Sequence, residues 1–322
     1  MSNTVYQSNT FLTLRGWLRS FVVVVAALLM TTAGLMAASG GDHGTSEHHG
    51  LSAYAPPIFW GIGGDAATKK VGPLAITNSM LVTWIVALVV IIFAQYATRK
   101  IKDVPDGAQN FWEWLVESLH NFLESIIGHE LIKKTFWFFA TLFIFILFTN
   151  WAGLIPGVGT IGWGIPNAQG GLDHIARPLF RGANADLNMT LAMASLFFLC
   201  WIIWALQANG FGGFILHIFG PKGDTKGLMK VLMIFVFVIV GVLEVVSILF
   251  RPVSLSFRLY GNVFAGENML ESMAALVPSL SWLIPVPFYF MELLVGLVQA
   301  LVFMLLTAVF TLLICQHEEG HH

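Results

Sequence analysis

Charged residues are the scarcest class in this sequence. Asp, Glu, Lys and Arg together make up 11% of its 322 residues, whereas a typical soluble domain carries about 25%. So few charges would leave most of a water-exposed surface apolar, and 57% of the residues are hydrophobic. The composition therefore predicts an integral membrane protein. The formal net charge of −2 gives no reason to expect a nucleic-acid partner.

Motifs for metal binding, nucleotide binding and covalent catalysis are also missing from the sequence. The chain contains no GxxxxGK(S/T) phosphate loop, no metal-ligand spacing and no nucleophile triad. Cys200 and Cys315 both lie in apolar runs, which indicates small core residues rather than a disulfide. We therefore expect no cofactor, no metal and no catalytic centre within this chain. The cluster of His43, His48 and His49 is interpreted as a solvated segment, with metal binding as the alternative.

The N-terminal region has the order of a secretory signal. Arg15 and Arg19 precede an apolar run at 21–38, which ends in small residues. The sequence predicts a signal peptide over 1–39, and an uncleaved anchor is the alternative because the apolar run is long. Residues 40–75 are polar and rich in Gly, Pro and His, so we expect a solvated segment outside the membrane.

Five later stretches are long enough and apolar enough to cross a membrane. A helix that spans the hydrocarbon core of roughly 30 Å needs about 20 apolar residues. The candidate spans are 76–96, 136–155, 187–206, 228–250 and 288–316. Together they define a membrane domain over 76–316, followed by a short cytoplasmic tail at 317–322. Asp186 and Asn188 open the third span and are interpreted as its N-terminal cap.

The fourth stretch continues without a polar turn as far as residue 277. Only Arg251 and Pro252 interrupt its apolar character, so we predict one helix of about 48 residues, kinked at Pro252. At about 1.5 Å per residue its length is about 72 Å, which a core of roughly 30 Å holds only at a steep tilt. The predicted fold class is an all-α membrane protein with about five transmembrane helices, of which the last two form a long, tilted hairpin.

A more polar helix lies between the first two spans. Apolar side chains recur at i, i+3, i+4 and i+7, while Glu113, Glu117 and Glu124 occupy the other face. This pattern predicts an amphipathic helix that lies on the membrane surface or packs on a partner. Its predicted apolar face comprises Phe111, Trp114, Leu115, Ser118, Leu119, Phe122, Leu123, Ile126 and Ile127.

Basic residues indicate how these helices are oriented. Three clusters fall on one side of the membrane if each span crosses once; they are Arg99, Lys100 and Lys102, then Lys133 and Lys134, then Lys222, Lys226 and Lys230. That side is expected to be the cytoplasm, which leaves the mature N-terminus outside and the C-terminus inside. Arg177 and Arg181, in an outer loop, are mild exceptions.

Nearly all ionisable residues at membrane depth lie in the last two helices. Charges in a bilayer are costly and usually face a partner or a water-filled cavity. The spacing of seven predicts that Glu244, Arg251 and Arg258 share one helix face, with Asn262 one turn further along. The full set is Glu244, Arg251, Arg258, Glu267, Glu271 and Glu292, with the neutral polar residues Asn262, Asn268 and Gln299.

A sequence signature surrounds Arg258. The run RPVSLSFRLYGNVFAGE at 251–267 resembles the signature of subunit a of the rotary F-type ATP synthase, of the bacterial type. Three further runs resemble other landmarks of this family, namely NWAGLIPG at 150–157, ADLNMT at 185–190 and QALVFMLLT at 299–307. The resemblance covers about residues 76 to 316, in order and with matching spacing.

The resemblance implies a stator subunit that carries protons past a rotating ring of c subunits and couples their flow to ATP synthesis or hydrolysis. Its implied partners are the c-ring, the b subunits, the remaining ATP synthase subunits and the lipid of the bacterial inner membrane. Arg258 aligns with the essential arginine that faces the ring carboxylate. The implied pathway has an inner half-channel at Glu244 and an outer half-channel formed by Asn262, Glu267, Glu292 and Gln299.

Two positions depart from the family pattern. Many family members carry a Glu/His pair where this chain has Glu267 and Glu292. Two nearby carboxylates in a low-dielectric cavity are expected to share a proton and titrate together. Carboxylates also bind sodium, so a sodium-translocating subunit is an alternative. An ion-coupled secondary transporter is a further alternative, although the internal repeat expected of one is missing from the sequence.

Overall fold

The computed structural model describes residues 57–59, 76–99, 101–155, 157–158, 161–166, 172–219, 228–276 and 278–315. Its helices are α2 (Asn78–Thr98), α3 (Ala108–Ile127), α4 (His129–Gly153), α5 (Leu187–Phe219), α6 (Leu228–Leu276) and α7 (Val286–Cys315), with short 3-10 turns η1 (Ala183–Ala185) and η2 (Pro278–Leu280). The predicted all-α class is therefore confirmed. The predicted signal peptide at 1–39 and the tail at 317–322 lie outside the described residues.

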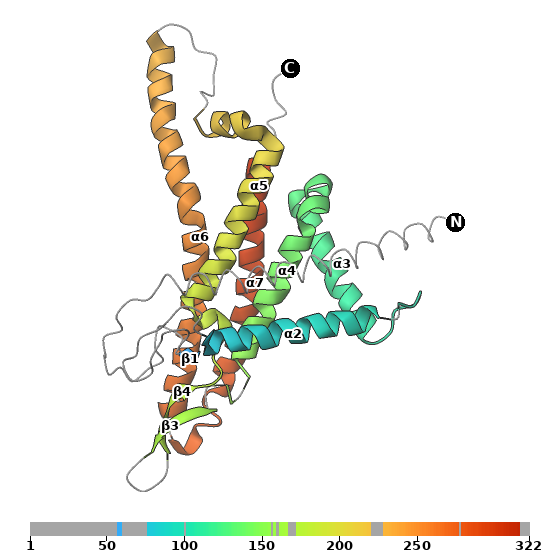
Figure 1. Ribbon diagram of the computed structural model, residues 1–322, viewed down its shortest axis with the longest axis vertical. Helices are drawn as coiled ribbons and strands as arrows, with labels where there is room; N and C mark the ends of the chain where they lie inside the picture. Colours follow the sequence, from blue (N-terminus) through green and yellow to red (C-terminus); the bar gives the residue numbers. More distant parts are fainter. Residues whose placement is uncertain are drawn as a thin grey trace.

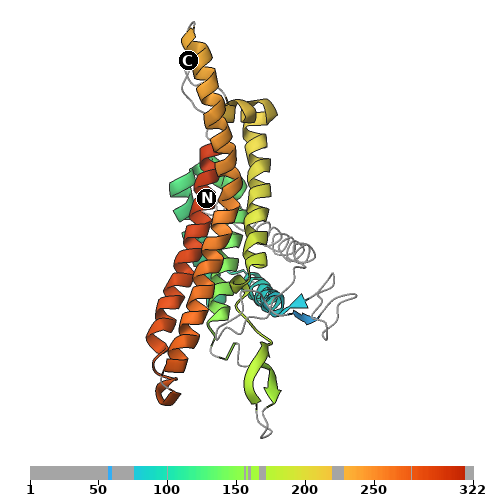
Figure 2. The ribbon, with the colours of Figure 1, turned by 90° about the vertical axis from the view of Figure 1, so that its left-hand side faces the viewer.

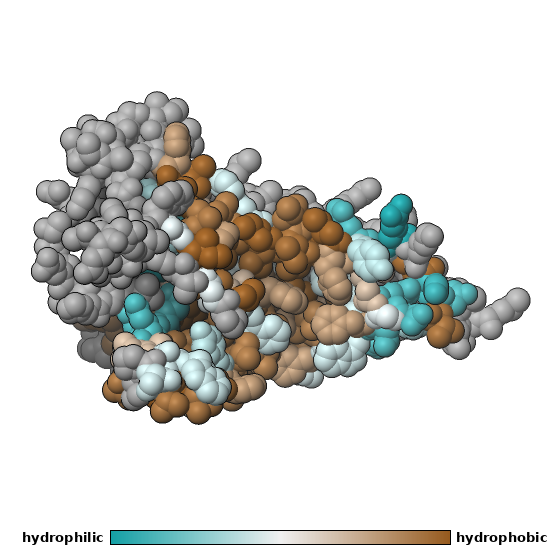
Figure 3. All heavy atoms as spheres, turned by 90° about the horizontal axis from the view of Figure 1, so that it is seen from below, coloured by the Kyte–Doolittle hydropathy of each residue, from teal (hydrophilic) through white to brown (hydrophobic). Residues whose placement is uncertain are grey.

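Five of the described helices are long and apolar enough to cross a membrane. They are α2, α4, the part of α5 at Leu187–Leu216, the part of α6 at Phe235–Leu276, and α7. Leu88, Val89 and Ile92 of α2 are each more than half exposed. An apolar band crosses the surface seen from below Figure 1, where α2 lies (Figure 3). Such an exposed apolar surface is expected of a helix that faces lipid.

Helices α6 and α7 form the predicted long hairpin. α6 runs as one helix of 49 residues through Pro252, and at about 1.5 Å per residue it is roughly 74 Å long. The views in Figures 1 and 2 show α6 and α7 side by side, joined through η2, with α2 lying across their common direction. An upright α2 would therefore leave α6 and α7 strongly inclined in the membrane, as their lengths require.

The core lies where α5 packs along α6 and α4 packs along α7. It is rich in aromatic side chains. Phe138 and Phe139 of α4 are fully buried and meet Trp204 of α5 edge to face. The loop before α5 folds into this bundle, and every residue from Arg181 to Asp186 is buried. This burial brings loop side chains against the helices that form the site described below.

Two short strand pairs were not predicted. β1 (Pro57–Phe59) pairs with β2 (Ile76–Thr77), and β3 (Gly162–Pro166) pairs with β4 (Leu172–Pro178), both antiparallel. Strands this short, with irregular register, give too little alternation to be recognised from sequence. β3, β4 and η2 lie at the same end of the bundle, at the bottom of Figure 1, which is called the hairpin end below.

The helix that contains the predicted third span, 187–206, extends beyond it. α5 continues to Phe219, with a break at Gly210, whose φ of 67° is in the left-handed region. Glycine adopts such a φ without the clash that a β-carbon causes. The chain therefore turns sharply at one residue and resumes as a short helix, visible as the bent end of α5 in Figure 1.

The amphipathic helix α3 forms as predicted, and the rest of the bundle covers only part of its apolar face. Trp112, Leu119, Leu123 and Ile127 are buried, whereas Phe111, Trp114 and Phe122 are largely exposed. The apolar sector of the helix is wider than its contact with α2, α4 and α7, so only part of it is covered. Periodicity locates the apolar sector but does not say which part of it the neighbouring helices cover.

Candidate functional site

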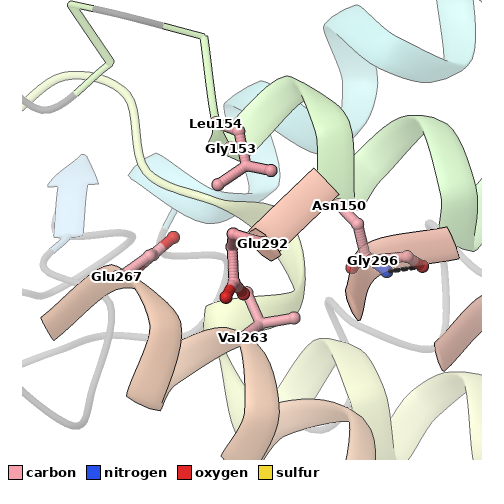
Figure 4. A pocket seen from close by; sticks show the side chains of 7 residues that line it. All are labelled: Asn150, Gly153, Leu154, Val263, Glu267, Glu292 and Gly296. Carbon is pink, nitrogen blue, oxygen red and sulfur yellow. Dashed lines mark hydrogen bonds between the residues drawn. The ribbon is translucent and has the colours of Figure 1, made fainter. Parts of the chain in front are cut away.

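Two acidic side chains line one small cavity towards the hairpin end. Glu267 extends from α6 and Glu292 from α7, and Figure 4 shows both reaching into the gap between these helices and the end of α4. The cavity, of about 10 Å³, has room for roughly one water molecule. The remaining lining residues are Asn150, Gly153, Leu154, Val263 and Gly296.

Glycines provide the space that these carboxylates occupy. A β-carbon on Gly266 would overlap the carboxylate of Glu292, and one on Gly182 would overlap the carboxylate of Glu267. A β-carbon on Gly153 would lie 3.0 Å from the Cα of Gly182, so the end of α4 lies against the buried loop. Each carboxyl group therefore occupies space that a side chain on the facing glycine would fill.

Glu267 has an arginine partner that sequence analysis did not find. The Nε atom of Arg181 lies 3.7 Å from Oε2 of Glu267, and their side chains are only 4% and 12% exposed. The backbone amide of Gly182 donates a further hydrogen bond to the same carboxylate. The Arg181 guanidinium also lies over the ring of Phe264, 5.9 Å from its centroid. From the sequence, Arg181 was noted only as an exception to the charge asymmetry of the loops. The one feature that could have indicated a functional role was the presence of an arginine in an outer loop of a chain with so few charges.

Amide side chains fix the buried loop to α4 and α7. Asn184 donates from Nδ2 to Thr149 Oγ1 at 2.8 Å and to Asn150 Oδ1 at 2.7 Å. Asn150 in turn donates to the backbone oxygen of Gly296 at 3.0 Å, as Figure 4 shows. Because Asn150 also lines the cavity, one hydrogen-bonded chain connects the loop, α4 and α7 beside the two carboxylates.

Asp186 fixes the other end of the loop. It accepts a hydrogen bond from Ser79 Oγ at 2.7 Å and one from the Asn188 amide at 3.0 Å. The second bond supports the capping interpretation, since it satisfies a backbone donor in the first turn of α5. Burial raises the pKa of Asp186, while these hydrogen bonds and the charge of Arg181 oppose that rise. The loop is therefore held by α2 as well as by α4 and α7.

Arg258 lies elsewhere, on the outward face of α6. Its side chain is exposed beside Phe257, in a surface that is otherwise largely apolar. None of the ion pairs between described residues involves Arg258. Asn262, one turn further along α6, is half-buried. The arrangement presents a guanidinium at membrane depth to whatever covers this face.

Glu244 is paired within its own helix. Its Oε1 atom lies 3.0 Å from the Nη2 atom of Arg251, as the predicted shared face requires. Arg251 also lies over the ring of Phe310 in α7, 4.7 Å from its centroid. Glu244 precedes Glu267 by 23 residues, which is about 34 Å along a helix. The two carboxylates therefore occupy opposite parts of α6, with Arg258 between them.

The four residues aligned with an outer half-channel divide into two groups. Glu267 and Glu292 line the cavity, whereas Asn262 and Gln299 do not. Both of the latter are half-buried. Gln299 follows Glu292 by seven residues, about 10 Å along α7, and Asn262 precedes Glu267 by five residues on the antiparallel helix α6. Both amides therefore lie on the Arg258 side of the cavity.

Comparison with known proteins gives one consistent result. The family model described as ATP synthase A chain matches residues 80–311. The chain is 31% identical to "ATP synthase subunit a" of Gloeobacter violaceus over 260 residues, which cover 80% of this chain and 92% of that protein. It is 34% identical to the protein of the same name from Trichlorobacter lovleyi, over 73% of this chain and 86% of that one. A third such protein, from Geobacter sulfurreducens, is 33% identical over 75% of this chain and 91% of its own length.

Proposed function

Because this chain belongs to the ATP synthase A chain family, we propose that it is the stator subunit that carries protons through the membrane part of a rotary ATP synthase. The five apolar helices in the described part of the chain, together with its relatives, make it a multi-pass membrane subunit of that enzyme. In this proposal it forms two offset half-channels against a rotating c-ring and is held by b subunits. Proton flow along it drives ATP synthesis, or ATP hydrolysis drives the flow in reverse.

The exposed guanidinium of Arg258 is the observation that carries the proposal. An arginine does not deprotonate in proteins, and a charge at membrane depth needs a partner or water. Among the described residues Arg258 forms no ion pair, so a carboxylate on a separate subunit is the partner whose charge suits it. A ring of c subunits, each with a buried carboxylate, would supply such partners in turn.

The mechanism follows from one fixed positive charge beside a moving carboxylate. A ring carboxylate that faces lipid is neutral because burial disfavours its charge, whereas beside Arg258 its ionised form is favoured. A proton therefore cannot pass directly across the arginine. It loads onto a ring carboxylate on one side, travels with the ring, and leaves on the other side. Each charge moved through 100 mV supplies roughly 2.3 kcal/mol.

The positions of the other polar residues fit two offset half-channels. We assign the cavity with Glu267 and Glu292, at the hairpin end, to the outer half-channel. Asn262 and Gln299 continue that path towards Arg258, and Glu244 belongs to the inner half-channel. In this orientation the mature N-terminus lies outside the bacterial inner membrane and the C-terminus lies in the cytoplasm. Sodium in place of protons would make transport depend on sodium concentration, and proton flux measured without sodium separates the two ions.

The experiment that tests this function replaces Arg258 by Ala in the assembled complex. Inverted membrane vesicles should lose ATP-driven acidification, and passive proton leak under an imposed potential should rise, since no cation separates the half-channels. Arg258→Lys should also abolish coupled pumping, because an ammonium that the c-ring covers can lose its proton and lacks the planar fork of a guanidinium. Arg99→Ala, at the exposed end of α2, is the matched control. ATP-driven pumping by Arg258→Ala vesicles with an assembled complex would refute the proposal.

A further inference from the structure

Arg181 is buried although it belongs to a loop. An arginine on a loop normally keeps its charge in water, whereas this side chain is 4% exposed and faces a carboxylate that is itself 12% exposed. A buried charge requires compensation, because the interior does not solvate it as water does. The loop is held in place by the hydrogen bonds of Asn184 and Asp186 to α4 and α2. The fold therefore fixes a cation beside Glu267.

The two carboxylates of the cavity are not equivalent in this arrangement. Glu267 has the Arg181 guanidinium and the Gly182 amide against it. Glu292 lies against the backbone of Gly266, and within the described part of the chain it forms no ion pair. The charged groups near Arg181 and Glu267 are Asp186, which precedes α5, and Glu292 from α7. Arg181 is thus the cation of a cluster that contains three carboxylates.

We propose that Arg181 is a positioning residue of the outer half-channel, which holds the Glu267 carboxylate in the cavity and sets the pH range over which it exchanges protons. The inference rests on the proposed ion-carrying function. A cation at this distance favours the ionised form of a carboxylate, and a partner fixed by the loop also restricts where that carboxylate points. Arg181 is buried against Glu267, so we expect it to act on transport through Glu267.

The test measures passive proton conduction in vesicles stripped of the soluble ATPase, as a function of pH on the outer side. Arg181→Gln is compared in three backgrounds: wild type, Glu267→Gln and Glu292→Gln. In the wild-type background it should lower conduction about tenfold. It should also shift the pH of half-maximal conduction upward by roughly one unit or more, because loss of the cation favours protonated Glu267. In the Glu267→Gln background neither effect should remain, whereas both should persist with Glu292→Gln.

Arg181→Lys supplies a rescue, since it keeps the charge. It should restore the pH of half-maximal conduction to the wild-type value, while conduction itself stays below wild type because an ammonium cannot reproduce the guanidinium geometry. If Arg181→Gln alone fails to assemble but the double variant Arg181→Gln, Glu267→Gln assembles, the Arg181–Glu267 ion pair is supported. The single variant leaves the Glu267 carboxylate buried without its cation, whereas the double variant removes both charges. If neither assembles, the pH profile of Arg181→Lys decides, and a displaced midpoint there overturns the proposal.

Two other results would overturn the inference. One is an equal loss of conduction from Arg181→Gln whether or not Glu267 is present, which would indicate a role in packing. The other is an unshifted pH midpoint in Arg181→Gln. The Arg258→Ala experiment separates this outcome from failure of the proposed function, since it does not involve Arg181. Loss of pumping in Arg258→Ala together with additive effects of Arg181 and Glu267 would remove only this inference.

Discussion

Substitution of Gly266 by Ala tests whether the position of Glu292 controls proton entry. The new methyl group would overlap the Glu292 carboxylate, so that side chain must leave its place in the cavity. Inserting a methylene-sized group into a packed site typically costs about 1–3 kcal/mol. The helix itself gains up to about 1 kcal/mol from Gly→Ala, so the net loss of subunit stability should be at most about 2 kcal/mol.

The displaced carboxylate should also slow transport. If about 1.4 kcal/mol of the overlap appears in the barrier to proton entry, the rate falls roughly tenfold. Passive proton conduction and proton-driven ATP synthesis in vesicles should therefore both fall by about that factor. Shortening the obstructed side chain, with Glu292→Asp in the Gly266→Ala background, should recover part of the loss because the carboxylate then withdraws from the methyl group.

Gly212→Ala is the matched control for this experiment. A β-carbon on Gly212 meets no atom within 4 Å, so this substitution should leave conduction unchanged. Assembly of each variant is checked by co-purification of the soluble ATPase subunits. Wild-type conduction by an assembled Gly266→Ala complex would refute the reasoning, as would an equal loss in Gly212→Ala.

Two further predictions concern the acidic residues. Glu267→Gln and Glu292→Gln should each slow proton-driven ATP synthesis without preventing assembly. Because both side chains line one cavity, the rate of the double variant should fall by less than the product of the two single reductions. A fall equal to that product would contradict a shared path. Burial raises the pKa of Asp186, so the folded state binds its proton more tightly than the unfolded state, and wild-type stability should fall as pH rises from about 4 towards the folded pKa. The Asp186→Asn variant keeps an acceptor for Ser79 but has no carboxyl group to titrate, so its stability should not fall over this pH range. The thermal midpoint of Asp186→Asn minus that of wild type should therefore increase as pH rises. A difference that stays constant with pH would contradict the argument.

Sequence alone determined the features of this protein that depend on length, composition and local spacing. Scarce charge and five apolar stretches predicted the membrane class, and the uninterrupted run through Pro252 predicted one helix too long to stand upright. The spacing of seven predicted that Glu244 and Arg251 would share a face, and they form an ion pair. These properties follow from helix periodicity and from the thickness of a bilayer, neither of which depends on distant parts of the chain.

Tertiary structure decided which distant residues meet. Arg181 and Glu267 lie far apart in the sequence, and nothing local to either residue indicates the pairing; it exists because the loop before α5 folds into the bundle. Likewise, the space for Glu292 comes from a glycine on another helix. The same limit applies to α3, whose periodicity gave an apolar sector but not the edge that α2, α4 and α7 cover. Local patterns fix what each helix is, whereas contacts between elements depend on how helices cross and where loops enter, which no single segment encodes.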